Sequence, residues 1–543
     1  MATAGVPVLR FMEPWSVAAC ALLLLVCARD TVVPSTVSVS STTSARSEAV
    51  SLDRGPLFLP LHIRADITSI GADRWQDAGF TGYGRSVAVI DSGFSGYLGE
   101  LGDGLPADVT VRSFRGDRDI EGGTDHGLRA AELVHGVAPN AAIYLVNFGT
   151  TSELSVLVDY LIAEDVDVVS FSLGFIHNGP GDGTGEVNAI VERAVAAGIA
   201  WSVASGNWAE QHWGGLFWDE DGDSVHDFAP GKPLNGHTFL AGDLVTASLR
   251  WADVWGKACT DYDLELFGPD GSLVGAARDI QDCDGDPVES VQVLATKSGR
   301  YSVRVIDASS EVPLQLSILL LGSPDRGDSL DLVTAAGSLT QPADSPRVLT
   351  VGALGLSSTT AVFSSRGPTA DGRTKPDVLA TSGVIDGIGP SFSGTSAAAP
   401  HAAGMLALLG EAFPNEGGIS LISQLTARAN AATFGGTPLA SLASLAGLGE
   451  LLPVGADEAK LAGIVPPSGG IAAFQYQGPD GYPLRFSHLL TGLVQAVAFF
   501  RLDDGEQKWE SHIIGAPDFV QDFEKLNNLD IVVARFPLAI SGE

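Results

Sequence analysis

The feature that most constrains the fold is a regular alternation of apolar, strand-like runs with helical segments between residues 65 and 207. The strand-like runs, rich in Val and Ile, lie at 86–90, 142–148, 166–172 and 200–205. The helical patterns between them lie at 128–134, 153–164 and 186–198. Runs that are almost entirely apolar suit parallel strands covered on both faces. The sequence therefore predicts an α/β domain with a parallel sheet and helices on both of its faces.

This alternation stops between about residues 213 and 335, where short strand-like runs are separated by Gly, Pro and Asp. Such a pattern predicts an all-β sandwich inserted into the α/β domain. Parallel-strand character resumes at 347–354, and helices are expected at 396–413 and 419–430. Strand-like pieces after residue 447 predict a small β-rich C-terminal region.

The predicted organisation is a signal peptide at 1–28, a linker or short prosegment at 29–64, the α/β domain at 65–212 and 339–446, the inserted sandwich at 213–338 and the C-terminal domain at 447–543.

The N-terminal segment points to export. Residues 15–28 form an apolar run that is short for a bilayer-spanning helix and typical of a signal peptide. We therefore expect a secreted protein, with an uncleaved membrane anchor as the alternative. Cys259 and Cys283 lie beyond this segment, and an even pair in an exported chain predicts a disulfide.

Composition excludes some classes of protein and partner. Hydrophobic residues make up 45% of the chain and charged residues 18%, which argues against wholesale disorder. The 65 acidic residues outnumber the 31 basic ones, giving a net charge of −34 that repels nucleic acids and anionic membranes. This charge suits a secreted protein, a salty environment or bound cations, and composition does not rank the three. It does not predict an oligomeric state either.

Three residues at element boundaries form a candidate catalytic set. Asp91 follows a strand, His126 precedes a helix and Ser396 opens another helix in "GTSAAAPHAAG". Taken singly, each has a structural explanation, because Asp and Ser cap helices and turns and a lone His is more often structural. Together they supply the nucleophile, base and orienting carboxylate that acyl transfer needs.

Six motifs then identify a family. "VAVIDSG", "DHG", "VDVVSFSLG", "ASGN", "FSSRGPTADGRTKPDV" and "GTSAAAPHAAG" together resemble the subtilisin-like serine proteases, over roughly residues 65–213 and 340–430. The resemblance implies that Asp91 orients the base His126, that Ser396 is the nucleophile, and that Asn207 donates to the oxyanion with the Ser396 backbone N–H. It implies protein or peptide substrates and no cofactor for the chemistry itself.

The resemblance also implies a substrate-binding cleft. The matching backbone segments are Ser172-Leu173-Gly174 and Ala204-Ser205-Gly206, which flank the first specificity pocket. Because these residues are small and include no acid, we expect medium or large apolar side chains before the scissile bond, without a preference for Lys or Arg. His135 and His401 are interpreted as structural.

The chain departs from the family pattern in three places. Residues 127–132 read Gly-Leu-Arg-Ala-Ala-Glu where the family usually has Gly-Thr-His-Val-Ala-Gly, a sandwich replaces a short loop, and residues 29–65 are short for a folding-assistant prodomain. A catalytically inactive surface-binding protein with this fold is the main alternative to a secreted endopeptidase. An esterase is disfavoured, because Ser396 does not lie in a G-x-S-x-G elbow.

The acidic stretch "DEDGDSVHD" at 219–227 is a candidate calcium site. Asp219, Asp221, Asp223 and Asp227 offer carboxylate oxygens, and Gly222 permits a tight turn. The alternative is a solvated acidic turn without an ion.

Overall fold

The computed structural model describes residues 70–309, 313–322, 329–355, 360–382 and 392–429, together with the backbone of short strands outside these ranges. The predicted signal peptide, linker and C-terminal domain lie outside the residues whose side chains are described. Within the described residues no helix is both long and apolar enough to cross a membrane.

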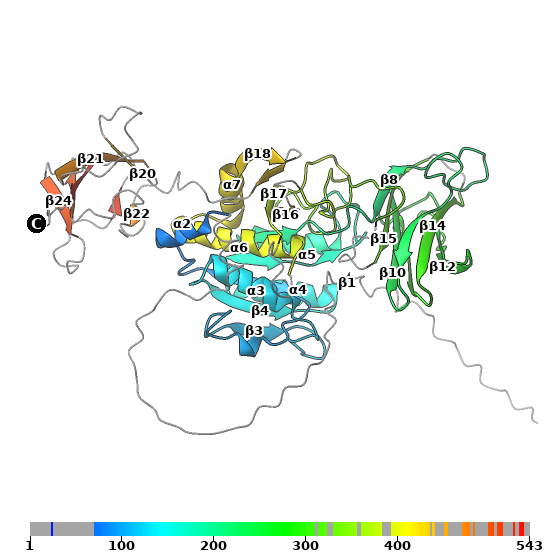
Figure 1. Ribbon diagram of the computed structural model, residues 1–543, viewed down its shortest axis with the longest axis horizontal. Helices are drawn as coiled ribbons and strands as arrows, with labels where there is room; N and C mark the ends of the chain where they lie inside the picture. Colours follow the sequence, from blue (N-terminus) through cyan, green and yellow to red (C-terminus); the bar gives the residue numbers. More distant parts are fainter. Residues whose placement is uncertain are drawn as a thin grey trace, which may run out of the picture.

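A parallel sheet forms the centre of the molecule (Figure 1). Its seven parallel strands among the fully described residues are, in spatial order, β3 (Thr110–Ser113), β4 (Ala142–Asn147), β2 (Ser86–Asp91), β5 (Val168–Phe171), β7 (Ala200–Ala204), β16 (Leu349–Leu354) and β17 (Val378–Thr381). The strands β19 (Thr437–Leu439) and β18 (Asn430–Phe434) continue it beyond β17.

Helices cover both faces of this sheet, as predicted. One face packs on α2 (Ala72–Asp77), α3 (His126–Val137), α6 (Thr395–Ala412) and α7 (Gly418–Arg428), and the other on α4 (Thr151–Ala163) and α5 (Glu186–Ala196). The strand β2 shows why its sequence is apolar throughout. Val87 and Val89 belong to the first hydrophobic cluster, whereas Ala88 and Ile90 belong to the second. Alternate residues of a strand point to opposite faces, so both must be apolar when both are covered.

The chain leaves this α/β domain after β7 and forms two antiparallel four-stranded sheets before returning in β16. One sheet has the order β13 (Val288–Leu294), β10 (Leu244–Trp251), β15 (Gln315–Leu321), β8 (His212–Leu216), and the other β12 (Leu273–Ala277), β11 (Tyr262–Phe267), β14 (Gly299–Asp307), β9 (Asn235–Phe239). Their facing side chains share one apolar core. The inserted sandwich is therefore confirmed as an architecture, while the domain boundaries stay a prediction.

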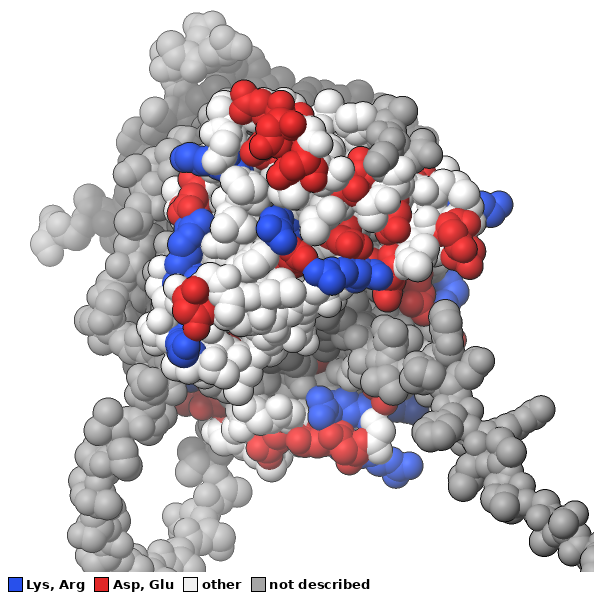
Figure 2. Space-filling view, turned by 90° about the vertical axis from the view of Figure 1, so that its right-hand side faces the viewer, with Lys and Arg blue, Asp and Glu red and all other residues white. Residues whose placement is uncertain are grey.

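The sandwich lies at one end of the molecule (Figure 1). Figure 2 shows clusters of Asp and Glu on this end, with separate Lys and Arg side chains between them. The expected disulfide between Cys259 and Cys283 is present in the sandwich.

The remaining elements are short. They are β1 (Leu23–Leu24), which pairs with β6 (Gly174–Phe175), the 3-10 helix η1 (Tyr97–Gly99), and the C-terminal strands β20 (Glu450–Pro453), β21 (Gly470–Gln477), β22 (Tyr482–Pro483), β23 (Ala498–Asp503), β24 (Lys508–Ile513), β25 (Lys525–Leu526) and β26 (Ile531–Phe536). Five of these C-terminal strands form a sheet of order β20-β21-β26-β23-β24.

Candidate active site

Asp91 and His126 form a buried pair at the carboxyl edge of the sheet. Asp91 is the last residue of β2, and His126 is the first residue of α3. The Nδ1 atom of His126 lies 2.9 Å from Oδ1 and 2.8 Å from Oδ2 of Asp91. The backbone N–H of Ser92 donates to Oδ1 of Asp91 at 2.7 Å and holds the carboxylate in place. Because a carboxylate accepts, His126 donates from Nδ1 and keeps the lone pair of Nε2 for a proton.

The charge of Asp91 governs the proton affinity of His126. Burial lowers the pKa of His126, but the charge of Asp91, its hydrogen bond and the charge of Asp125 outweigh burial, so the pKa is raised from its ordinary value. Nε2 of His126 and Oγ of Ser396 are both buried, and neither has a hydrogen-bond partner among the described residues. These two atoms are the ones that nucleophilic catalysis would connect.

The start of α6 presents Ser396. Gly394 precedes the helix with φ +97°, a conformation that favours glycine, and as the N-cap residue it has no side chain to cap the helix. Ser396 lies in the first turn and is fully buried. The interpretation of the Gly-Thr-Ser triplet as a simple helix cap therefore does not describe it. Because the first N–H groups of a helix have no helical acceptor, the backbone N–H of Ser396 is available to an oxyanion.

Asn207 is fixed beside this helix start by Thr395. Its Oδ1 atom accepts from the backbone N–H of Thr395 and from the Thr395 hydroxyl, each at 2.9 Å. The amide nitrogen therefore faces away from these donors. It lies next to Gly394, where a Cβ would come within 2.7 Å of it. A glycine at 394 thus serves both the backbone conformation and the approach of the Asn207 amide.

The predicted cleft contains a very small cavity. Of the six residues named for the cleft, Ser172, Leu173, Gly174, Ala204 and Gly206 line this cavity, whereas Ser205 does not. Its volume is about 10 Å³, enough for roughly one water molecule.

Three further residues line this cavity that sequence reasoning did not single out: Trp208, Thr340 and Thr395. A Cβ on Gly174 would meet Oγ1 of Thr340 at 2.4 Å, so Thr340 packs directly on the floor of the cleft. Trp208 and Thr395 adjoin predicted residues in the sequence and were within reach of that reasoning. Thr340 lies far along the chain from the predicted cleft residues, and no sequence motif pointed to it.

His135 and His401 agree with the structural interpretation. Both are buried, and burial lowers the pKa of each to about 4, so both are neutral near pH 7. Nδ1 of His401 bonds the carbonyl of Ala397 within α6.

The acidic loop brings three of its four predicted ligands together. Carboxylate oxygens of Asp219, Asp221 and Asp227 lie within 4.8 Å of one another. Asp223 is not part of this group, and its Oδ1 accepts from the backbone N–H of Val225 at 2.9 Å. Burial raises the pKa of Asp219, but backbone N–H groups, first that of Gly222, outweigh it and lower the pKa. The group is an acidic cluster with the oxygen donors that calcium prefers.

Comparison with known proteins gives consistent matches. The family model described as the Subtilase family matches residues 82–229 and 327–439, on either side of most of the sandwich. The minor extracellular protease Vpr of Bacillus subtilis is 26% identical over 405 residues, covering 64% of this chain and 48% of that protein. Subtilisin of Bacillus pumilus is 29% identical over 161 residues, covering 26% of this chain and 54% of that protein.

The chain therefore spans about half the length of these two curated relatives. Among solved structures, the CspB protease of Clostridium perfringens matches with a TM-score of 0.49 and 18% identity, over 70% of this chain and 96% of that one. From its two matching stretches and its relatives, the chain belongs to the subtilase family of subtilisin-like serine peptidases.

Proposed function

We propose that this protein is a secreted serine endopeptidase that cleaves peptide bonds through Asp91, His126 and Ser396. The observation that carries the proposal is the buried contact of Asp91 with Nδ1 of His126, at 2.8 and 2.9 Å. Because Nδ1 is engaged with Asp91, Nε2 is left to accept a proton. An inactive binding protein has no chemical use for this pair together with a buried serine hydroxyl, at a helix start, that has no hydrogen-bond partner among the described residues. Extracellular placement is supported by the apolar run at 15–28, the disulfide and the extracellular relative.

The chemistry follows from these positions. Oγ of Ser396 attacks the substrate carbonyl carbon as Nε2 of His126 accepts its proton, and the carbonyl electron pair moves to oxygen. The backbone N–H of Ser396 and the amide nitrogen of Asn207 stabilise the resulting oxyanion. The amine leaves with the proton from His126, and the acyl group stays on Ser396. Water then gives a proton to Nε2 of His126 and attacks the ester carbon. The bond to Oγ of Ser396 breaks, Oγ takes the proton back from His126, and the acid is released.

The size of the cleft cavity supports a narrow substrate preference. At about 10 Å³ it accommodates roughly one water molecule, which favours a small side chain. The expectation of large apolar residues before the scissile bond therefore finds no support here, and we propose Gly, Ala or Ser at that position instead. Thr340 and Trp208, which are both buried, line the cavity together with these small residues.

Calcium would be a structural ion at the acidic loop. Asp219, Asp221 and Asp227 would hold it, with backbone carbonyls and water supplying the remaining oxygens of a 6–8-coordinate ion. When bound, it would tie the loop between β8 and β9 and would take no part in the chemistry.

A fluorophosphonate probe tests the proposed catalysis. The secreted wild type should be labelled and should cleave a peptide library, whereas Ser396→Ala should lose labelling and about 10⁶-fold in kcat, the magnitude established for subtilisin. Ser298→Ala, which changes an exposed serine of the sandwich, should keep both properties. Unlabelled wild type, or an active Ser396→Ala variant, would instead favour a binding protein with this fold.

A further inference from the structure

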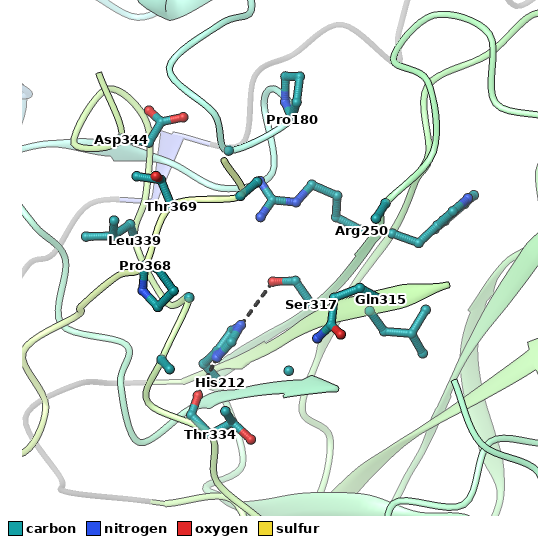
Figure 3. Close-up of a pocket in the computed structure, with 18 of the residues that line it drawn as sticks. Pro180, His212, Arg250, Gln315, Ser317, Thr334, Leu339, Asp344, Pro368 and Thr369 are labelled. Atoms are coloured by element: carbon teal, nitrogen blue, oxygen red, sulfur yellow. Dashed lines mark hydrogen bonds between the residues drawn. The ribbon is translucent and has the colours of Figure 1, made fainter. Parts of the chain in front are cut away.

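A cavity of about 500 Å³ lies at the seam between the sandwich and the α/β domain (Figure 3). We call it the seam pocket. Arg250 and Ser317 line it from the sandwich, and Pro180, Leu339 and Thr369 line it from the α/β domain. Its volume falls in the range of pockets that hold small organic ligands. It is distinct from the cleft cavity, with which it shares no lining residue.

One cationic side chain dominates the pocket. Arg250, near the end of β10, reaches across it toward Thr369 and Asp344 (Figure 3). Nη1 of Arg250 donates to the carbonyl of Gly179 at 3.0 Å. No ion pair with a carboxylate joins its guanidinium among the described residues. Burial lowers the pKa of Arg250, although Asp344 and Asp182 act on it from a longer range.

The backbone packs closely against the guanidinium of Arg250 at a glycine. A Cβ on Gly181 would lie 2.5 Å from Nη1 and 2.8 Å from Nη2 of Arg250, so any side chain there would displace it. Gly181 also has φ +83°, which disfavours other residues. The wall over Arg250 is therefore bare backbone.

The polar floor of the pocket is neutral. Nδ1 of His212 donates to the carbonyl of Thr334, so its Nε2 accepts from the hydroxyl of Ser317 at 3.0 Å. Ser317 in turn accepts from Nε2 of His177 at 3.1 Å. Burial lowers the pKa of His212 to about 4, and it remains uncharged near pH 7. The hydrogen bonds among His177, His212 and Ser317 are made within this group, and the group places no charge beside a ligand.

The two carboxylates on the lining are already engaged. Asp344 accepts from the side-chain amide of Asn188 and from the backbone N–H of Gly183, both at 3.0 Å. Asp253 accepts from the backbone N–H groups of Cys259 and Thr260, both at 2.9 Å. Arg250 is therefore the charged group of the lining with hydrogen-bond donors left for a ligand.

We propose that the seam pocket binds a molecule that carries a carboxylate on an apolar body. A guanidinium pairs with a carboxylate through two charge-assisted hydrogen bonds, and a desolvated one gains most from such a partner. Leu316, Leu339 and Trp255 line the pocket and supply apolar surface for the body. The C-terminus of a peptide ending in an apolar residue has this chemistry, and so does a small aromatic acid.

The pocket adjoins the substrate cleft through one segment of chain. Leu339 lines the seam pocket, and the next residue, Thr340, lines the cleft cavity. The following residue, Gln341, exchanges backbone hydrogen bonds of 2.9 and 3.0 Å with Phe175 of β6. An occupant of the seam pocket would thus contact the segment that also lines the cleft cavity, although its binding does not depend on catalysis.

Isothermal titration calorimetry on the full chain tests the proposal, with Ser396→Ala as background to prevent turnover. The probes are N-acetyl-leucyl-phenylalanine, its C-terminal amide and 3-phenylpropionate. We expect at least one acid to bind and the amide to bind about 10–100-fold more weakly, because a hydrogen bond to a charged group is lost. The tighter of the two acids identifies the source of the ligand, a peptide terminus or a small acid.

Variants locate the binding. Arg250→Gln should weaken the acid about 10–100-fold, and Ala370→Trp should weaken it by filling the pocket from an exposed position of its rim. Arg193→Gln, which changes a half-exposed arginine of α5, should leave binding unchanged. Equal affinity for acid and amide, no binding of either acid at millimolar concentration, or acid binding that survives both pocket variants would overturn the proposal. Ala370→Trp keeps the test decisive if Arg250→Gln fails to fold.

Discussion

The hydroxyl of Ser172 donates to the backbone carbonyl of Ser396 at 2.8 Å. In a regular helix this carbonyl would accept from the N–H four residues later, but that residue is Pro400, which has no N–H. Ser172, just after β5, therefore replaces the missing helical donor at the residue that we propose as the nucleophile. A proline in the second turn of α6 and a serine that lies 224 positions before Ser396 form one structural unit.

Replacing Ser172 should therefore harm both stability and catalysis. In Ser172→Ala the Ser396 carbonyl is left buried without a partner, and we expect the free energy of unfolding to fall by about 1–3 kcal/mol. We also expect kcat to fall about 10–100-fold, because a displaced nucleophile attacks poorly. Urea denaturation and steady-state kinetics measure the two effects.

Ser202→Ala is the matched control. Ser202 donates to the carbonyl of Ala399 at 2.8 Å, but that carbonyl also has a helical donor in Ala403. This variant should lose stability and keep kcat. A similar loss of kcat in both variants would argue against a specific role for Ser172.

Thr340 should set the size of the residue accepted before the scissile bond. Thr340→Ala removes the hydroxyl that packs on Gly174 and enlarges the cleft cavity. We expect the ratio of kcat/KM for a Val substrate to that for an Ala substrate to rise at least about tenfold, the usual scale for one or two carbon atoms in a pocket. Leu339→Ala, a change on the same segment outside the cavity, should leave the ratio unaltered. A wild type that already prefers Leu or Phe would refute the assignment.

The acid limb of the pH profile should lie above pH 6.5. His126 acts as a base only when neutral, and its pKa is raised from 6.5 because Asp91 outweighs burial. Activity should therefore fall as pH drops through this raised value, measured as kcat/KM against pH. Asp125→Asn removes a smaller contribution to the same shift and should move the limb to lower pH. A limb below pH 6.5 in the wild type would contradict the direction of the shift.

The raised pKa of His126 makes folding stability fall as pH rises, whereas it makes activity rise. Because the pKa of His126 is raised in the folded state, its contribution is fully present below pH 6.5 and is lost as pH rises through the folded value. His212 acts in the other direction. Its pKa of about 4 destabilises the fold progressively as pH falls from 6.5 toward 4.

Calcium should stabilise the wild type through the acidic loop. Binding to the folded state alone adds about 2.7 kcal/mol at a hundredfold excess over Kd. We expect Asp221→Ala to lose the rise in Tm that calcium gives over chelator, and Asp223→Ala to keep it, because only Asp221 belongs to the clustered carboxylates. An equal rise in both variants would place any stabilising ion elsewhere.

The sequence by itself determined the α/β core, because an apolar strand such as β2 must be covered on both faces and its pattern records this locally. It also indicated Asp91, His126 and Ser396 as the candidate catalytic residues, since each carries its motif within a few neighbouring residues. The fold then brought Asp91 and His126 into contact as the parallel sheet requires.

Only the tertiary structure decided what fills the space between these elements. Thr340 on the cleft floor, Ser172 on the Ser396 carbonyl and the open side of Arg250 all depend on residues far apart in the chain. No local pattern encodes them, because cavity size and the pairing of buried polar groups are set by how packed surfaces meet. The acidic loop shows the same limit, since spacing suggested four ligands and the turn brought three of them together.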